Sequence, residues 1–479
     1  MALIHARGAV LLGGGLLVVT AELGCGSLGH DAPPEPVARD PRTGLVDGPG
    51  IEVCLGGTRV VAPSRATGGA LSVCVAPVAV ERRCSDTSEC AAGERCVCGR
   101  CVTRPCRNAT ECEAREVCLG GRCASVCTSA SACGPNETCT AGGCARRCGS
   151  SADCAYGEQC SALDGTCIVK LCGPSISCGG DQTCVQQEHV ADLREPHVTV
   201  WSGQRIAYVE LREQAGATTS CAVHRARVVS PRRWEIDPVA PVLAPADGDG
   251  DCVGAPSVVD AGGRMILYAA RGDGTGLIRA TSVDGVAFER SPGVIWSATQ
   301  SWEGGWVGSP GAVSFGGATI VFYAADGGRA LGRVQVDETN GHVQMPDTRP
   351  VLVPSDVEDP LFWRQMERIT APFPVVRDGV LLLYFQGRGV EGADAEIAAG
   401  GAYPADINDS IGLAATRDLV DWELFPSGPI LARKANLRAY LGELEPSVWF
   451  DEAGGWLVYV GADATGRATT GLGLAASAP

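Results

Sequence analysis

The chain has 479 residues, of which 45% are apolar and 20% are charged. This length exceeds that of a typical single domain, so we expect two or three domains with their own cores. The 55 acidic residues outnumber the 39 basic ones, and the net charge of −16 would repel phosphate backbones and anionic lipid headgroups. The composition therefore predicts no nucleic-acid partner.

Residues 1–24 have the pattern of a signal peptide. An uncharged apolar run from Gly8 to Val19 follows Arg7, and this run is too short to span a bilayer stably. Two cleavage routes fit the residues that follow. Val19-Thr20-Ala21 suits an ordinary signal peptidase, whereas Leu23-Gly24-Cys25 resembles a bacterial lipobox, whose cysteine is acylated and becomes the new N-terminus.

The cysteine count favours the lipobox. The chain has 25 cysteines, an odd number, and acylation of Cys25 would leave 24 that can all pair. Residues 25–50 are rich in Pro, Gly and Asp, as expected of a flexible tether. We therefore expect a lipoprotein of the bacterial cell envelope, anchored to the outer membrane or cell surface only through its N-terminal lipid. A secreted protein is the alternative.

Residues 84–184 form a ladder of cysteine-rich repeats. Four copies share the spacing x5, x5 and x4 or slightly longer, and a fifth copy stops one cysteine short. The first residues of the five copies are Cys84, Cys106, Cys127, Cys148 and Cys172. Each unit of about 22 residues has few large apolar side chains, so we expect disulfides to hold it. Zinc is the alternative, although structural zinc sites favour C-x2-C pairs.

The ladder resembles the Dickkopf N-terminal type of cysteine-rich repeat. The resemblance implies a stiff, protease-resistant stalk or, alternatively, a protein-binding module. Cys54 and Cys74 precede the ladder, and we expect a Cys54–Cys74 disulfide to close a small β segment over residues 51–80. Cys98 is an extra cysteine in the first copy. Its pairing with the unmatched cysteine of the fifth copy, which ends at Cys184, would balance the count, but the connectivity stays open.

Residues 187–479 contain a phrase that occurs five times. A proline is followed by a β-rich run, a turn with glycine, and a second run that reaches a tyrosine 12 or 13 residues later. The five copies are Pro196–Tyr208, Pro256–Tyr268, Pro310–Tyr323, Pro372–Tyr384 and Pro446–Tyr459. A third and a fourth strand follow in most copies. Five units of four strands predict an all-β fold, a five-bladed β-propeller behind a disulfide-rich stalk.

The last copy has only three strands before the chain ends. An open edge in a propeller is unfavourable, so we expect a segment near Cys184–Val190 to supply the missing strand and close the ring. Cys221 and Cys252 are the only cysteines in this part of the chain, and we expect them to join blade 1 to the start of blade 2.

The blade phrases resemble the five-bladed glycosidase superfamily, which includes arabinanases, levansucrases and invertases of glycoside hydrolase families 43, 68 and 32. The resemblance covers about 290 residues, and it lies in phrases such as Ala255–Val259 and Ile411–Trp422. It implies that the residue before each blade's proline faces a central funnel. The family's general base is an Asp in blade 1 and its general acid is a Glu in blade 4; this chain has Glu195 and Ala371 there.

Blade 5 offers a second acid, Glu445, and blades 1 and 5 are neighbours in a closed ring. Glu195 and Glu445 are therefore the candidate catalytic pair; alternatively they bind an arginine or a sugar hydroxyl. The resemblance places further candidate ligand-binding residues on the same face. These are His197, Trp302, Glu303, Trp306, Trp363, Arg364, Arg438, Tyr440 and Glu443.

No cofactor is expected, and no metal site is assigned. Asp247, Asp249 and Asp251 alternate like calcium ligands but lack the glycine and the final acid of an EF-hand loop, so a solvated turn is favoured over Ca²⁺. The preferred function is carbohydrate binding without the family's acid/base pair. The alternatives are hydrolysis of arabinan, fructan or xylan by Glu195 and Glu445, and a propeller for protein binding or adhesion.

Overall fold

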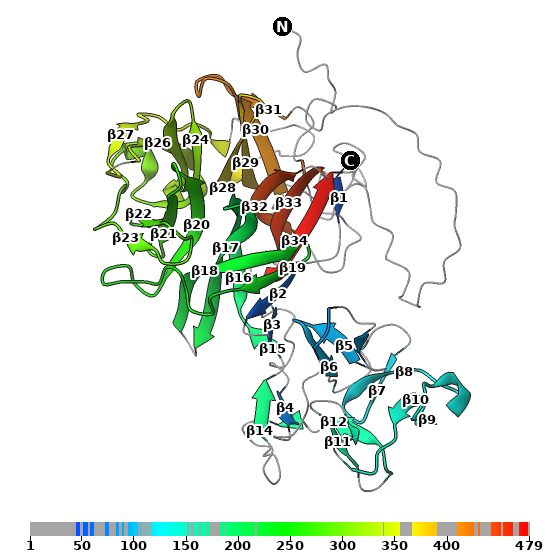
Figure 1. The fold of residues 1–479 in the computed structure, drawn as a ribbon. Coiled ribbons are helices and arrows are strands. Elements are labelled where there is room, and N and C mark those ends of the chain that lie inside the picture. The colour runs from blue at the N-terminus through cyan, green and yellow to red at the C-terminus, as the bar shows by residue number, and fades with distance from the viewer. Residues whose placement is uncertain are drawn as a thin grey trace, which may run out of the picture. The chain divides into compact units, whose positions relative to one another are not determined.

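The structure is a computed structural model, shown in Figure 1. The residues that it describes are 45–47, 51–55, 58–61, 72–75, 83–85, 89–90, 94–103, 106, 112, 116–150, 153–154, 158–161, 164–169, 171–172, 183–186, 188–215, 218–338, 340–354, 366–389, 410–425, 430–431, 442–451, 454–462 and 469–477. Over these residues the chain forms β-strands and short 3-10 turns. None of its described helical turns is long and apolar enough to cross a membrane.

The chain divides into two compact units. The first unit contains residues up to 51 and residues 191–479, and the second contains residues 52–61 and 65–190. The cysteine-rich segment is therefore an insertion in the sequence of the first unit. The described residues 45–47, which precede it, belong to the same unit as residues 191–479.

The first unit is the predicted five-bladed propeller, with four strands in each blade. From the innermost strand outward, blade 1 consists of β16 (Asp192–Trp201), β17 (Gln204–Ala215), β18 (Thr218–Ser230) and β19 (Arg233–Ile236). Blade 2 consists of β20 (Val253–Asp260), β21 (Met265–Arg271), β22 (Leu277–Ser282) and β23 (Glu289–Arg290). Blade 3 consists of β24 (Val307–Phe315), β25 (Ala318–Ala325), β26 (Ala330–Val336) and β27 (Val343–Pro346).

Blade 4 consists of β28 (Met366–Arg377), β29 (Val380–Gly389), β30 (Ser410–Thr416) and β31 (Glu423–Leu424). Blade 5 consists of β32 (Gly442–Asp451), β33 (Gly454–Ala462), β34 (Thr469–Ser477) and β1 (Leu45–Asp47). The innermost strands of neighbouring blades contact one another all the way round, including β16 with β32. The ring is therefore closed between the first and the last blade.

The strand that completes blade 5 comes from the N-terminal side of the cysteine-rich segment. β1 pairs antiparallel with β34, with Val46 opposite Ala476, and Figure 1 shows the two side by side. The amide of Ile51 also donates to the carbonyl of Leu472, at 2.8 Å. The predicted closing segment Cys184–Val190 was wrong, because β14 (Thr183–Gln186) pairs with β4 (Ser72–Val75) and β15 (Glu188–Val190) pairs with β3 (Thr58–Val61).

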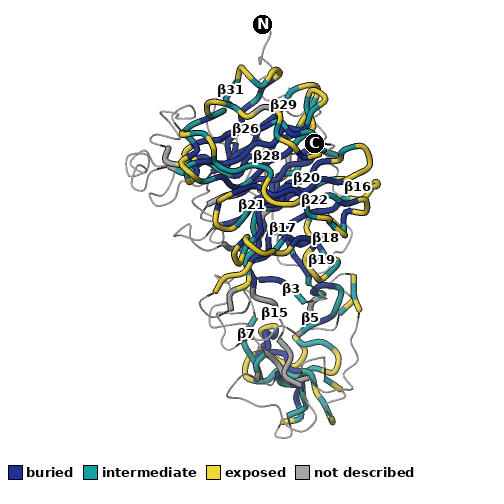
Figure 2. The backbone as a smooth tube through the Cα atoms, turned by 90° about the vertical axis from the view of Figure 1, so that its left-hand side faces the viewer, coloured by how far each residue is buried: buried dark blue, intermediate teal, exposed yellow. Residues whose placement is uncertain are grey.

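The recurring tyrosines belong to the propeller core. Tyr208, Tyr268, Tyr323 and Tyr459 are completely buried. The Tyr208 hydroxyl donates to the carbonyl of Gly285, in the next blade, at 2.6 Å. Buried stretches follow the strands of the blades in Figure 2. The phrase found in the sequence is thus a packing motif, in which each blade buries the ring of its tyrosine.

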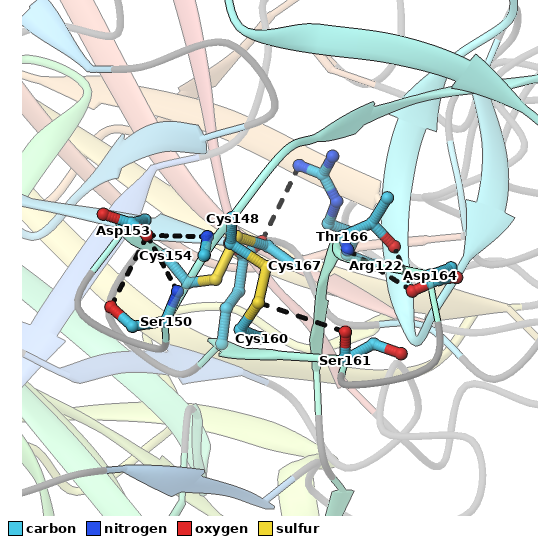
Figure 3. The surroundings of a disulfide bond; sticks show 12 residues. Arg122, Cys148, Ser150, Asp153, Cys154, Cys160, Ser161, Asp164, Thr166 and Cys167 are labelled. Carbon is cyan, nitrogen blue, oxygen red and sulfur yellow. Dashed lines mark hydrogen bonds and ion pairs between the residues drawn. A yellow bond between two sulfur atoms is a disulfide. The ribbon is translucent and has the colours of Figure 1, made fainter.

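The first four cysteine-rich repeats of the second unit form small disulfide-linked hairpins. They are β5–β6 (Glu94–Val97, Arg100–Thr103), β7–β8 (Glu116–Leu119, Arg122–Ser125), β9–β10 (Glu137–Thr140, Gly143–Arg146) and β11–β12 (Glu158–Cys160, Cys167–Val169). In each of these four repeats the first cysteine pairs with the third and the second with the fourth. Figure 3 shows the last of these repeats, with Cys148–Cys160 and Cys154–Cys167. The predicted disulfide-held repeats are confirmed.

The hairpins also pack on one another. Arg122 and Glu158 are buried and form an ion pair at 3.7 Å, and Arg122 donates to the carbonyl of Cys144 at 2.8 Å. These contacts join three consecutive repeats. The repeats with buried cross-contacts form a packed body instead of a string of independent beads.

Two cysteine pairs lie outside this pattern. Cys54, in β2 (Glu52–Leu55), bonds to Cys98, so the expected Cys54–Cys74 disulfide and the pairing of Cys98 with the fifth copy were wrong. Cys221 and Cys252 are bonded to each other and join β18 of blade 1 to the residue before β20 of blade 2. Spacing alone does not determine such pairings, because only the fold brings the sulfur atoms together.

Candidate functional site

The same irregularity occurs in the innermost strand of every blade. The residue before each blade's proline has a positive φ, between 41° and 53°, and the strand register shifts at that point. The five residues are Glu195, Ala255, Ser309, Ala371 and Glu445. A positive φ is unfavourable for residues other than glycine, so a bulge that occurs in all five blades indicates a requirement of the ring geometry. These bulges form the centre of the candidate site.

The structure brings the predicted acids Glu195 and Glu445 together. The amide of Glu195 donates to Glu445 Oε2 at 2.7 Å, so the Glu445 carboxylate lies against the backbone of blade 1. The Glu195 side chain reaches across to blade 3, where Ser309 Oγ donates to its Oε1 at 2.8 Å. Three of the five bulge residues are therefore joined by hydrogen bonds.

Arg194 holds Glu445 from the other side. Its Nη1 lies 3.3 Å from Glu445 Oε1, and its Nε donates to Asp192 at 3.0 Å. The Glu445 side chain is only 9% exposed and that of Arg194 is 16% exposed. Both oxygens of Glu445 therefore have donors, one backbone and one guanidinium.

A third glutamate, Glu210 in β17, belongs to the same cluster and was missed in the sequence. Its Oε2 accepts the amide of Ala255 at 2.8 Å, and its Oε1 accepts from Arg212. The carboxylate lies where a side chain of Gly254 would be, since a Cβ there would be 1.8 Å from Glu210 Oε2. The signal in the sequence was an acid within the apolar run Ile206–Leu211.

The cluster favours the neutral form of Glu195. Burial and the neighbouring carboxylates of Glu445 and Glu210 raise the pKa of Glu195 well above its ordinary value, against the effect of the Ser309 hydrogen bond. Burial also raises the pKa of Glu445, which Arg194 opposes. Close carboxylates in a site of low polarity commonly share such a proton.

His197 lies in the ring interior and not on an open surface. Its ring is buried, its centroid is 4.9 Å from that of Phe373 in blade 4, and it is hydrogen-bonded to the backbone of Val258 in blade 2. Burial lowers the pKa of His197 from 6.5 to about 3. The ring is therefore neutral at physiological pH and packs as part of the core.

Replacement of His197 by Gln should make the propeller less sensitive to acid. In the unfolded chain histidine takes up a proton near pH 6.5, whereas the native ring stays neutral down to about pH 3. The contribution of His197 to the free energy of unfolding is therefore complete above pH 6.5 and is lost progressively as the pH falls towards 3. Through His197, lowering the pH from 7 to 5 should reduce the free energy of unfolding by about 2 kcal/mol. His197→Gln should remove this reduction. Urea unfolding of both proteins at the two pH values measures the difference. Equal losses in both proteins would contradict the assignment of a neutral native ring.

Two of the predicted ligand-binding residues have structural roles. Glu303 is completely buried and accepts hydrogen bonds from Tyr323 Oη at 2.6 Å and Trp296 Nε1 at 3.0 Å, besides two backbone amides. Trp302 stacks on Tyr323, with centroids 6.3 Å apart and an angle of 18° between the rings. Both side chains therefore stabilise blade 3.

Trp306 lies closer to the bulges. Its indole occupies the space beside two glycines, since a Cβ on Gly274 would be 1.8 Å from its Nε1 and one on Gly308 would be 2.7 Å from its Cη2. Gly308 directly precedes Ser309. Trp306 is half-buried and packs against the core residues shared by blades 3 and 4.

Not every predicted residue belongs to the described part of the chain. Trp363, Arg364, Arg438, Tyr440 and the acylation candidate Cys25 lie outside the described residues, and Glu443 is described only as part of the backbone of β32.

Two arginines bind the carboxylate of Asp249, one of the candidate calcium ligands. Its carboxylate is buried, accepts from Arg290 Nη2 at 2.7 Å and lies 3.4 Å from Arg271. The Arg290 hydrogen bond lowers the pKa of Asp249. The clusters of cysteine sulfur atoms in the second unit are explained by the disulfides. The arginines and the disulfides therefore account for the contacts of both groups.

Comparison with known proteins gives similarity in structure alone. No family model matches the chain, and no curated protein matches it. Similar solved structures include a glycoside hydrolase (15% identity, 60% of this chain and 88% of the other, TM-score 0.47). A thermostable family-43 glycoside hydrolase has 14% identity over 59% of this chain and 89% of its own, with a TM-score of 0.43. An α-L-arabinofuranosidase from Clostridium thermocellum has 15% identity over 56% and 82%, with a TM-score of 0.40.

Proposed function

We propose that the propeller binds carbohydrate at its central bulges and does not hydrolyse it. The observation that carries this proposal is the engagement of Glu445, whose two carboxylate oxygens accept from the Glu195 amide and face Arg194. A general acid must bring its proton to the leaving oxygen of the substrate, and Glu445 would have to give up one of these partners to do so. Blade 4 offers Ala371 where the resembling enzymes have their acid.

The same cluster suits the recognition of a sugar. Glu195 and Ser309 place a carboxyl group and a hydroxyl group side by side, and paired groups of this kind bind sugar hydroxyls. The half-buried Trp306 beside them offers an apolar ring on which a sugar face can stack. A few polar groups beside an aromatic wall are the usual composition of a small-molecule site.

One observation favours hydrolysis as a second candidate. The raised pKa of Glu195 is the property that a general acid needs, and Glu445 lies next to it. In that case Glu195 would be the acid and Glu445 the base or nucleophile.

Glycan-array binding and hydrolysis assays separate these candidates. We expect binding to one class of glycan, no products from arabinan, fructan or xylan, and a loss of affinity of at least tenfold in Glu195→Gln. Products that disappear in both Glu195→Gln and Glu445→Gln would establish the hydrolase instead. An empty array together with inactive assays would exclude both and favour a propeller for protein contacts or adhesion.

We also propose that the protein is a lipoprotein of the bacterial cell envelope, acylated on Cys25. The lipobox-like sequence and the odd cysteine count support this assignment. The tether then leads into β1, so the lipid would hold the propeller by its closing strand. Metabolic labelling with a fatty acid, compared between the native sequence and Cys25→Ser, tests it; equal labelling of the two would exclude acylation at Cys25.

A further inference from the structure

The hairpin of β17 and β18, in blade 1, extends further beyond the bulges than the corresponding hairpins of blades 2 and 3. In blade 1 the bulge lies opposite Val209, and residues 210–215 then form six pairs with residues 218–223. Blade 2 has one such pair beyond its bulge, Ala270 with Leu277, and blade 3 has two. At about 3.3 Å per pair, the difference of four or five pairs makes the blade 1 hairpin roughly 15 Å taller.

Contacts along both edges fix the position of this hairpin. At its inner edge β16 pairs with it as far as Arg212. At its outer edge the amide of Val223 donates to the carbonyl of Leu243, in the segment that leads to blade 2, at 2.9 Å. The Cys221–Cys252 disulfide joins the hairpin to the end of the same segment. The blade 1 hairpin is therefore a braced extension of its sheet and differs from an unsupported surface loop.

The two groups proposed to bind sugar lie on a line that leads to this hairpin. Glu195 belongs to blade 1, and its Oε1 accepts from Ser309 Oγ of blade 3 at 2.8 Å. A ligand that binds both groups therefore extends from blade 3 to blade 1. Because β17 is the next strand outward from β16, a chain that continues outward past Glu195 meets the hairpin. In the opposite direction, past Ser309, blade 3 has only two strand pairs beyond its bulge.

We propose that the blade 1 hairpin stops a bound carbohydrate chain, so that the protein recognises the end of a glycan chain and not its interior. This inference rests on the proposed carbohydrate binding and adds its ligand class. Arg212 lies at the base of the hairpin, bonded to Glu210, and 37% of its side chain is exposed. A terminal sugar has one hydroxyl more than an interior unit, and a guanidinium can donate to such an oxygen. Arg212 is therefore the residue that we expect to contact the terminal sugar.

The first test counts the proteins that bind to one glycan chain. Calorimetry on the full mature protein would use linear arabinan, linear xylan, inulin and the best glycan of the array, each as a long polymer and as its hexasaccharide. We expect one protein per chain at both lengths, because each chain has one end of the recognised kind. A number that increases with chain length would overturn the inference but leave carbohydrate binding intact. Failure of every glycan, on the array as well, would remove the proposed function too.

The second test shortens the hairpin to the height of blade 3. Leu211 and Ala222 are joined by Asn-Gly, and Cys252→Ser and Glu210→Gln replace the two groups that would lose their partners. Removal of four pairs, an even number, keeps the alternation of hydrogen-bonded pairs that a two-residue turn requires. We expect the number of proteins bound to each long polymer to rise at least twofold, because chains can now pass over blade 1.

The matched control has the full hairpin and carries Cys221→Ser, Cys252→Ser and Glu210→Gln. It should still bind one protein per chain, and this count does not depend on any change in affinity. The thermal midpoint of each variant verifies that it is folded. A folded, shortened protein that binds one per chain, like the control, would overturn the inference. Should the shortened protein not fold, the count on the native protein decides.

Discussion

A protein that begins at residue 52 should form a much less stable propeller than one that begins at residue 41. The shorter chain lacks β1, whose backbone completes blade 5, and also lacks the buried Ile51, whose amide donates to Leu472. Without them β34 would have an unpaired edge, next to the seam where the ring closes. We expect the free energy of unfolding to fall by about 3 kcal/mol or more, which lowers the thermal midpoint by about 6–12 °C in a domain of this size.

Tryptophan fluorescence is the suitable measurement, because all nine tryptophans lie at residue 201 or beyond and the signal reports on the propeller alone. Addition of a peptide of residues 41–51 to the shorter chain should raise its thermal midpoint part of the way back, since the strand need not be covalently attached. A scrambled peptide is the control. Equal midpoints of the two chains would show that β1 does not close the ring.

The closing strand illustrates what the sequence could not provide. The five tyrosine phrases predicted the blade count and the incomplete last blade, because buried strands carry a strong pattern of apolar residues. β1 is only three residues long and lies on an outer edge, in a segment rich in glycine, proline and aspartate. A strand of that length carries no periodicity. Nearness in the sequence then favoured the wrong segment before blade 1.

The site was predictable to the extent that it depends on the repeat. Glu195, Ser309 and Glu445 stand before the blade prolines, and aligning the five phrases placed them on one ring. Glu210 and Arg212 are not part of the phrase. Their role depends on which residue faces the bulge of the next blade, and this follows from strand register and not from composition. Comparison of Glu210 with the equivalent Ala270 could have identified it.

The second large effect should come from Arg194. Arg194→Met leaves the buried Glu445 carboxylate without its guanidinium, and the loss of one partner of a buried ion pair costs about 3–5 kcal/mol. Because Arg194 keeps some exposure to water, we expect a value near the lower end. Glu445→Gln in the same chain should recover most of this loss, since the amide carries no charge. Urea unfolding monitored by tryptophan fluorescence measures all three proteins.

Arg205→Met is the matched control. Arg205 forms an ion pair with Asp451 between the same two blades, 1 and 5, at 2.6 Å. Unlike Arg194 and Glu445, both of these side chains are about a quarter exposed. Arg205→Met should lower the free energy of unfolding by only about 1 kcal/mol. The pH gives an independent readout. Without Arg194 the native pKa of Glu445 rises further, so the defect of Arg194→Met should be largest at neutral pH and shrink as acid protonates Glu445. If Arg194→Met destabilises the protein no more than Arg205→Met does, or equally at every pH, then Glu445 is held by the Glu195 amide alone. Glu445 would then have to give up only one partner to act as a general acid.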